Sequence, residues 1–245
     1  MYIHEETKAG KTVVIRNHYT SRYHKRGLER SENTNLTTKA QEKANERKDI
    51  HELTIRMNAN FTEDDYHIIL TYQKSDRPPT PDEAKRDRRN FLRRMKEAYK
   101  ENGLELKYIA LTGYGVRGAP HHHIVISGNL SPAKMARIWN KGRLHSTPME
   151  DSGEYSKLAA YFASHRKNWK AHDGKGRMWT CSRNLIRPES KKWVVRADRY
   201  NKTPRPRKGF YVKKETVHEG ITSEGWPYLN YVLVSDPRAP GRKRE

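Results

Sequence analysis

One stretch, Tyr108 to Ser127, constrains the fold of this chain more than any other: YIALTGYGVRGAPHHHIVIS. Two apolar, strand-like runs, residues 107–111 and 124–126, flank a glycine-rich turn. Strands that follow each other so closely are most simply antiparallel neighbours in one sheet. The stretch therefore predicts a sheet that contains this hairpin.

The second of these strands opens with three consecutive histidines, His121, His122 and His123. Side chains alternate between the two faces of a strand, so His121 and His123 point one way and His122 points the other. Two imidazoles at adjacent positions of one face can bind one metal ion, and histidine is the commonest metal ligand. The simpler alternative is a solvated histidine run.

Further elements surround this hairpin. Residues 51–61 alternate apolar and polar side chains and predict a half-buried strand, and residues 66–72 predict a second one. Thr80 and Pro81 predict the start of a long helix that ends at Gly103. Shorter helices are expected after Ser131 and over residues 152–169, and further strands over 179–200 and 209–235. This order predicts an α+β fold, an antiparallel central sheet with helices packed on it, of the split-βαβ kind.

The charge of the chain indicates its partner. Lys and Arg number 50 against 29 Asp and Glu, which gives a formal net charge of +21. Such a basic excess points to a polyanion, most simply a nucleic acid, although a merely soluble basic surface is the alternative. A single cysteine, Cys181, allows no intramolecular disulfide. We find no apolar signal core or membrane span, so we expect a cytoplasmic protein with no membrane partner.

Composition suggests four regions. We expect a basic N-terminal arm over residues 1–50, which can lie along a phosphate backbone or remain a disordered leader. The catalytic domain would span residues 51–200, with C-terminal strands packed on it over 201–235 and a charged tail over 236–245.

Three motifs together resemble those of a known group of enzymes. HIILTY at residues 67–72, the histidine run at 121–123 and Tyr161 within KLAAYFASHR resemble the HUH endonucleases, the rolling-circle replication initiators of plasmids and phages. In the second motif His122 takes the place of the hydrophobic residue. Longer runs over about residues 38–234 look like the phage- and plasmid-type replication proteins of Gram-positive bacteria.

The resemblance implies an RRM-like HUH fold and a metal-dependent DNA nickase and strand transferase. Tyr161 would attack a phosphate of single-stranded origin DNA, leaving a 5′-phosphotyrosine link and a free 3′-hydroxyl. His121 and His123 would hold a divalent metal, Mg²⁺ or Mn²⁺. Host replication machinery is a further possible partner.

Tyr161 also suits this role by position. On the expected helix it lies off the apolar stripe that contains Tyr155, so it need not be a core residue. Lys157 and His165 lie one turn to either side and can favour the phenolate and contact DNA. Arg183 and Asn184, close to Trp179, suit contacts to phosphates and bases.

Two positions depart from the family pattern. The family usually carries a carboxylate metal ligand where this chain has Gly113, and often a lysine where it has Ser164. Two histidines alone bind hard cations weakly, because those cations prefer oxygen. The sequence does not choose among the acids and histidine that can replace the missing ligand, which are Glu63, Asp64, Asp65 and His67.

Two other functions are alternatives. A conjugative relaxase or a single-strand transposase would use the same chemistry, and the sequence contains no GxxxxGK[ST] loop that would add a helicase. A non-catalytic nucleic-acid-binding protein on an RRM-like sheet is supported by Gly113. The lack of an RNP-type aromatic run on the central strands argues against it.

Overall fold

The computed structural model describes residues 1–20, 39–115, 117–172, 179–195, 203–222, 225–236 and 238, without the side chains of residues 39–41 and 166. The chain forms two compact units. One unit combines residues 1–59 with 187–245, and the other is the continuous segment 60–186. This grouping differs from the boundaries near residues 50 and 200 that composition suggested.

The unit built from both ends of the chain contains a six-stranded sheet in the order β10-β11-β2-β1-β8, with β9 also paired to β11. Its elements are β1 (Tyr2–Ala9), β2 (Thr12–Tyr19), α1 (Lys39–Asn60), β8 (Ser190–Val195), β9 (Phe210–Val212), the 3₁₀ helix η2 (Lys214–Thr216), β10 (His218–Ile221) and β11 (Pro227–Ser235).

The N-terminal residues belong to this sheet, which corrects the expectation of a basic arm. β1 and β2 form an antiparallel hairpin that turns at Gly10, whose φ of 56° favours glycine. β2 also pairs with β11 and β1 with β8, so the hairpin lies inside the sheet. Ile3 and Ile15 are fully buried, and such burial is not available to a solvated arm. Residues 21–38, most of the rest of the expected arm, lie outside the described residues, as does nearly all of the expected tail.

Residues 51–61 form the end of helix α1, so the strand that the sequence predicted there is wrong. Leu53 and Met57 are fully buried and lie four residues apart, on one face of a helix. The alternation of Leu53, Ile55 and Met57 matched both periods, and a 22-residue run of helix formers decided for the helix. Asn58 donates a hydrogen bond to Thr12 Oγ1 (2.9 Å), which ties α1 to the sheet.

The second unit contains a five-stranded sheet in the order β6-β3-β5-β4-β7. Its elements are β3 (Tyr66–Thr71), the 3₁₀ helix η1 (Lys74–Asp76), α2 (Pro81–Glu101), β4 (Tyr108–Tyr114), β5 (Pro120–Ile126), α3 (Pro132–Ile138), β6 (Leu144–Pro148), α4 (Ser156–Ala171) and β7 (Trp179–Cys181).

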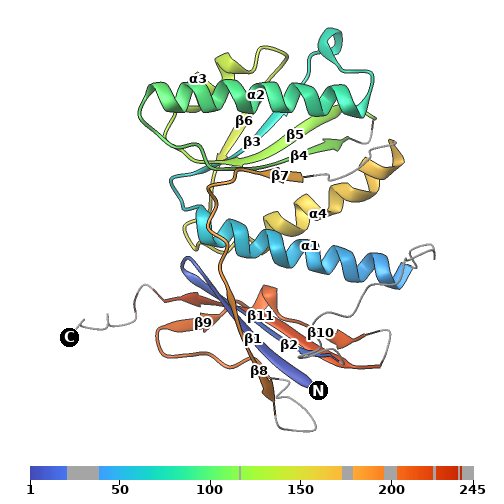
Figure 1. Ribbon diagram of the computed structural model, residues 1–245, viewed down its shortest axis with the longest axis vertical. Helices are drawn as coiled ribbons and strands as arrows, with labels where there is room; N and C mark the ends of the chain where they lie inside the picture. Colours follow the sequence, from blue (N-terminus) through green and yellow to red (C-terminus); the bar gives the residue numbers. More distant parts are fainter. Residues whose placement is uncertain are drawn as a thin grey trace. The chain divides into compact units, whose positions relative to one another are not determined.

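β5 is antiparallel to both β3 and β4, so these two run parallel on either side of it and are joined by α2. This arrangement is a split βαβ unit. Within this unit, α2 covers one face of the sheet and α4 lies on the opposite face (Figure 1). The predicted α+β class, an antiparallel sheet with packed helices, is confirmed.

Helix α2 forms where the sequence predicted it. Thr80 Oγ1 accepts a hydrogen bond from the backbone N–H of Glu83 (3.3 Å), and Pro81 occupies the first turn. Its buried stripe faces the sheet and forms one core with residues of β3, β4 and β5. The largest members of this core are Phe91, Met95, Tyr99, Ile68, Leu70, Ile124, Ile126 and Trp139.

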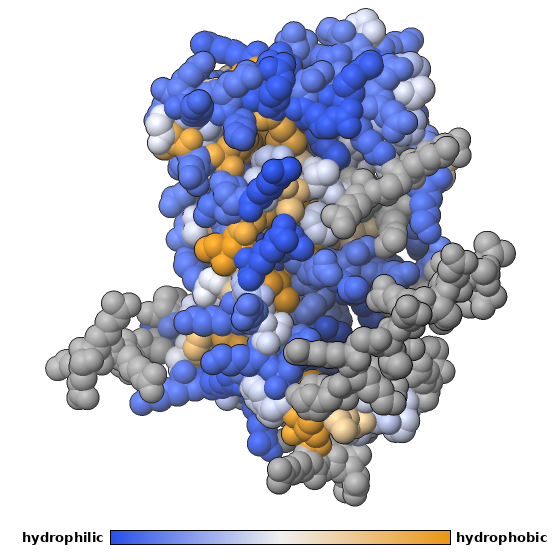
Figure 2. Space-filling view, viewed as in Figure 1, coloured by the Kyte–Doolittle hydropathy of each residue, from blue (hydrophilic) through white to orange (hydrophobic). Residues whose placement is uncertain are grey.

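None of the described helices combines the length and the apolarity that a bilayer crossing requires. The described residues on the face drawn in Figure 2 are mostly hydrophilic, as the charge of the chain leads one to expect.

His122 points into the core beneath α2 and links a buried chain of polar groups. Arg88 donates to Thr112 Oγ1 (2.9 Å), which lies 3.0 Å from His122 Nδ1. His122 Nε2 lies 2.7 Å from the Tyr72 hydroxyl, and that hydroxyl donates to Asp87 (3.3 Å). All of these contacts are satisfied at once when neutral His122 carries its proton on Nε2 and accepts from Thr112 at Nδ1. Burial, together with the charge of Arg88, holds the pKa of His122 well below its ordinary value.

We therefore predict that His122→Leu lowers the free energy of unfolding by about 1–3 kcal/mol, because Thr112 and Tyr72 lose buried partners. Urea denaturation followed by circular dichroism measures the change. The control is His145→Leu on β6, where the side chain is exposed and the expected change is within about 0.5 kcal/mol. Equal midpoints for the two variants would contradict a structural role for His122.

Candidate active site

His121 and His123 lie on the face of β5 opposite to His122, as the strand alternation predicted. Across the sheet, His121 pairs with Gly113 of β4, and His123 pairs with Leu111 of β4 and Ile69 of β3. His122 contacts Tyr72 in the core, whereas the ring of His123 faces Tyr161 of α4. His123 is 1% exposed, so only a group brought by an overlying element can reach it.

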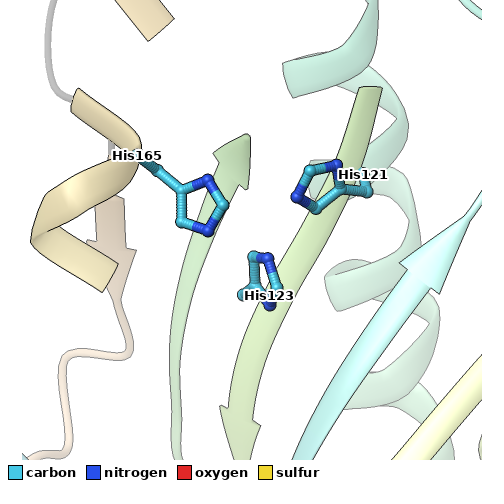
Figure 3. Close-up of side chains that lie close together, drawn as sticks. All are labelled: His121, His123 and His165. Atoms are coloured by element: carbon cyan, nitrogen blue, oxygen red, sulfur yellow. The ribbon is translucent and has the colours of Figure 1, made fainter. Parts of the chain in front are cut away.

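A third histidine from α4 joins this pair. One ring nitrogen from each of His121, His123 and His165 lies within 4.8 Å of the others (Figure 3). The ring centroid of His165 lies 4.6 Å from that of His123 and 5.3 Å from that of His121. The three imidazoles come from two elements and point toward one another, so this cluster can hold a metal ion.

Burial keeps these imidazoles neutral. Desolvation lowers the pKa of His165 to about 4, with a smaller contribution from His121, and it also lowers the pKa of His121. The pKa of His123 falls further, because the neighbouring histidines add to desolvation. A metal binds the neutral imidazole, so protons do not compete for these nitrogens at neutral pH.

His67 of β3 contacts the cluster from the side. Its Nε2 lies 3.2 Å from His123 Nδ1, and desolvation lowers its pKa to about 4. A ligating histidine commonly bonds its second ring nitrogen to such a partner, which fixes the ring orientation. His67, one of the four candidates for an extra ligand, is therefore placed to orient His123.

The acidic candidates lie elsewhere in the turn before β3. The Asp65 carboxylate accepts hydrogen bonds from the backbone N–H groups of Thr62 (2.7 Å) and Gly128 (2.9 Å). It closes a turn and joins two loops. In the part of the chain that the structure describes, neither Glu63, Asp64 nor Asp65 is among the residues that gather with the histidines.

Tyr161 lies at the edge of the histidine cluster. Its side chain is 44% exposed, and its hydroxyl lies 3.3 Å from His123 Nε2. Tyr161 and His165 are four residues apart on α4, and their rings are 4.9 Å apart. The site therefore places one phenol beside two of the three imidazoles.

The expected lowering of the Tyr161 pKa by its helical neighbours is wrong for the free protein. Partial burial raises the pKa of Tyr161. His165 is neutral, since its own pKa is lowered, and Lys157 is exposed one turn earlier. We therefore expect a phenolate at Tyr161 to form only when a bound cation stabilises it.

Tyr155 has a structural position, as its place on the apolar stripe predicted. It is 3% exposed, and its hydroxyl lies within hydrogen-bond range of the carbonyl oxygens of Glu150 (3.1 Å) and Phe61 (3.4 Å). Tyr155 precedes the first residue of α4 and does not contribute to the histidine cluster.

The predicted DNA-contact residues fall into two places. His165 belongs to the histidine cluster, which the sequence did not indicate; the signal was its spacing from Tyr161 combined with a glycine at 113. Arg183 and Asn184 are exposed and follow β7, where Asn184 donates to the carbonyl of Leu106 (3.3 Å). The preceding residue, Ser182, bonds to Tyr108, five residues along β4 from Gly113, or about 17 Å. The structure therefore does not bring Arg183 and Asn184 to the histidines, and their contact with DNA stays a prediction.

Residues 65–166 match the family model of the replication-associated protein ORF2. The matched segment contains β3, the histidine strand and the helix with Tyr161, which is the whole of the candidate site. This similarity, which covers less than half of the chain, supports a role in DNA replication. Comparisons with the curated proteins and with solved structures find no match.

The two tyrosines of this region should differ in their effect on stability. We predict that Tyr155→Phe lowers the free energy of unfolding by about 0.5–1.5 kcal/mol, because two carbonyl groups lose a buried donor. Tyr161→Phe should change it by less than about 0.5 kcal/mol, because its hydroxyl is at the surface. Urea denaturation of the two variants and the parent measures the difference, and a larger loss for Tyr161→Phe would contradict this assignment.

Proposed function

We propose that this protein is a rolling-circle replication initiator that nicks single-stranded origin DNA through Tyr161. The observation that carries the proposal is the position of the Tyr161 hydroxyl, 3.3 Å from His123 within a cluster that can hold a metal ion. The segment that forms this site is the one that matches the replication-associated family.

The reaction exchanges one phosphate ester for another. The Tyr161 oxygen attacks the scissile phosphorus, the bond from phosphorus to the 3′-oxygen breaks, and the phenol proton is balanced by protonation of that 3′-oxygen. The products are a 5′-phosphotyrosine and a free 3′-hydroxyl that can prime synthesis. Because no water is consumed, the link keeps the energy of the ester and the step can be reversed to rejoin a strand.

The residues of the cluster fit a cation. They are neutral, close to one another and protected from water, and His67 is positioned to orient His123. A bound divalent metal would offset the charge on the phosphate and favour the ionised phenol. In the free protein burial raises the pKa of Tyr161, so the tyrosine is unreactive until metal and DNA are present.

The same site serves a relaxase or a transposase, and a replication role is favoured by the family match. A binding protein without catalysis would need neither the exposed phenol nor the neutral histidines beside it. The distinction is measurable, because only the catalytic alternatives produce a covalent DNA adduct.

We predict that single-stranded oligonucleotides from around the encoding gene, incubated with divalent metal, become linked to Tyr161. Denaturing electrophoresis detects the adduct, and peptide mapping locates it. Tyr161→Phe should abolish both nicking and adduct while DNA binding survives, since only one oxygen is removed.

Tyr155→Phe is the matched control and should retain the adduct, because its hydroxyl is committed to backbone carbonyls. An adduct on any tyrosine other than Tyr161 would overturn the assignment. Tight DNA binding without cleavage of any oligonucleotide would favour the non-catalytic alternative.

The affinity for single-stranded DNA should fall steeply with salt, because a net charge of +21 implies many phosphate contacts and the release of their counterions. Six or more contacts would weaken binding by about 10³-fold between about 50 and 200 mM salt. Fluorescence anisotropy with a labelled oligonucleotide measures the slope. An affinity that stays constant over this range would exclude a phosphate-dominated interface.

A further inference from the structure

We propose that His165 is the third metal ligand, so that the site is an all-imidazole centre for a borderline transition-metal ion such as Zn²⁺, Co²⁺ or Ni²⁺ rather than for Mg²⁺. The inference rests on the proposed function for its role in DNA cleavage, but the binding of metal can be tested without DNA. It replaces the expectation of Mg²⁺ or Mn²⁺ that followed from the family resemblance.

The first observation is an imidazole nitrogen that is buried and unpartnered. His165 is 8% exposed, and its Nε2 has no hydrogen-bond partner among the described residues. Leaving a buried polar nitrogen unsatisfied costs about 1–3 kcal/mol. Such a nitrogen in a cluster of neutral imidazoles is explained if its partner is a metal ion.

The second observation is the glycine that makes room for this ring. Gly113 lies directly across from His121 on the neighbouring strand. A Cβ atom at Gly113 would lie 2.6 Å from His165 Nδ1 and 3.1 Å from His121 Nε2. Any other residue at 113 would therefore push the His165 ring away from the pair. Ligand and glycine are two parts of one arrangement: the space in which a side chain of β4 would stand is filled by an imidazole from α4.

The donor set decides the class of metal. Imidazole suits Zn²⁺, Ni²⁺, Cu²⁺ and Fe²⁺, whereas carboxylate, carbonyl and water oxygens suit Mg²⁺ and Mn²⁺. Three protein ligands with an open fourth position are typical of catalytic zinc sites. Within the described part of the chain, the residues that converge here supply nitrogen only. The open position would be left for a phosphate oxygen.

The location of His165 also links the metal to the nucleophile. His165 and Tyr161 are one turn apart on α4, whereas His121 and His123 belong to the sheet. A metal shared between α4 and β5 would fix the distance from Tyr161 to the cation. In a site built only from strand residues, the helix that carries the nucleophile would not be held by the metal.

The test is metal binding by the full chain after removal of bound ions with a chelator. Calorimetric titration with ZnCl₂, CoCl₂ and MgCl₂ gives the affinities, and the visible absorption of bound Co²⁺ reports its coordination. We expect Zn²⁺ and Co²⁺ to bind one per chain and Mg²⁺ to bind at least about 100-fold more weakly.

His165→Ala should weaken Zn²⁺ binding by more than about 100-fold and change the Co²⁺ spectrum, because a direct ligand is lost. His67→Ala should cost about 10–100-fold, the range for an outer partner of a ligand. The control His172→Ala, which removes a histidine just after α4 that stacks on Tyr114, should leave the affinity unchanged. Zn²⁺ affinity in His165→Ala within threefold of the parent, or Mg²⁺ binding as tight as Zn²⁺, would overturn the proposal.

A second pair of variants separates a ligand from a packing residue. Gly113→Ala should weaken Zn²⁺ binding although all three histidines remain, because its Cβ displaces the His165 ring. The double variant Gly113→Asp, His165→Ala exchanges an imidazole for a carboxylate in the same space, and should bind Mn²⁺ better than His165→Ala does. If the double variant gains no Mn²⁺ affinity, positions 113 and 165 do not share one ligand site.

Failure of this inference and failure of the proposed function give different results. A protein that forms the Tyr161 adduct with Mg²⁺ and ignores loss of His165 keeps the function and excludes the third ligand. A protein that binds Zn²⁺ through three histidines but never cleaves DNA keeps the metal site and excludes the nickase.

Discussion

The pairing of β4 with β5 is the constraint on which the rest of the site depends. This register sets Gly113 opposite His121 and Leu111 opposite His123. Because side chains alternate along a strand, one residue of the histidine run enters the core beneath α2, and its two neighbours face α4. A slip of one residue would exchange these roles, placing His122 at the site and two unpaired imidazoles in the core. The hydrogen bonds of His122 with Thr112 and Tyr72 make that slip costly.

The two faces of this sheet have different tasks. On the α2 side, apolar residues surround a closed chain of polar groups from Arg88 to Asp87, which gives the hairpin a defined position. On the α4 side, the nitrogens of three histidines converge, and His165 Nε2 has no hydrogen-bond partner within the described ranges. The stability of the first face supports the geometry of the second, since β5 contributes to both. The site is a product of the core rather than of a loop, so its ligands are held by packing on the strand.

Much of the 60–186 unit could be read from sequence, because its signals are local. The cap at Thr80, the strand over residues 66–71 and the alternation of the histidine run depend on neighbours within a few residues. The strand expected at residues 51–61 was wrong because Leu53, Ile55 and Met57 satisfy both a two-residue and a helical period. The N-terminal hairpin was missed as part of a sheet because its partners, β8 and β11, lie nearly the whole chain away.

By itself, the sequence determined the class of the fold, the basic charge and which two histidines share a face, since these follow from composition and strand geometry. It also singled out Tyr161 from Tyr155, because helical spacing separates an exposed position from a buried one. Only the tertiary structure decided that His165 reaches His121 and His123, and that Gly113 leaves the space for it. The packing angle of α4 on the sheet sets that distance, and no local pattern encodes an angle between elements that lie some forty residues apart.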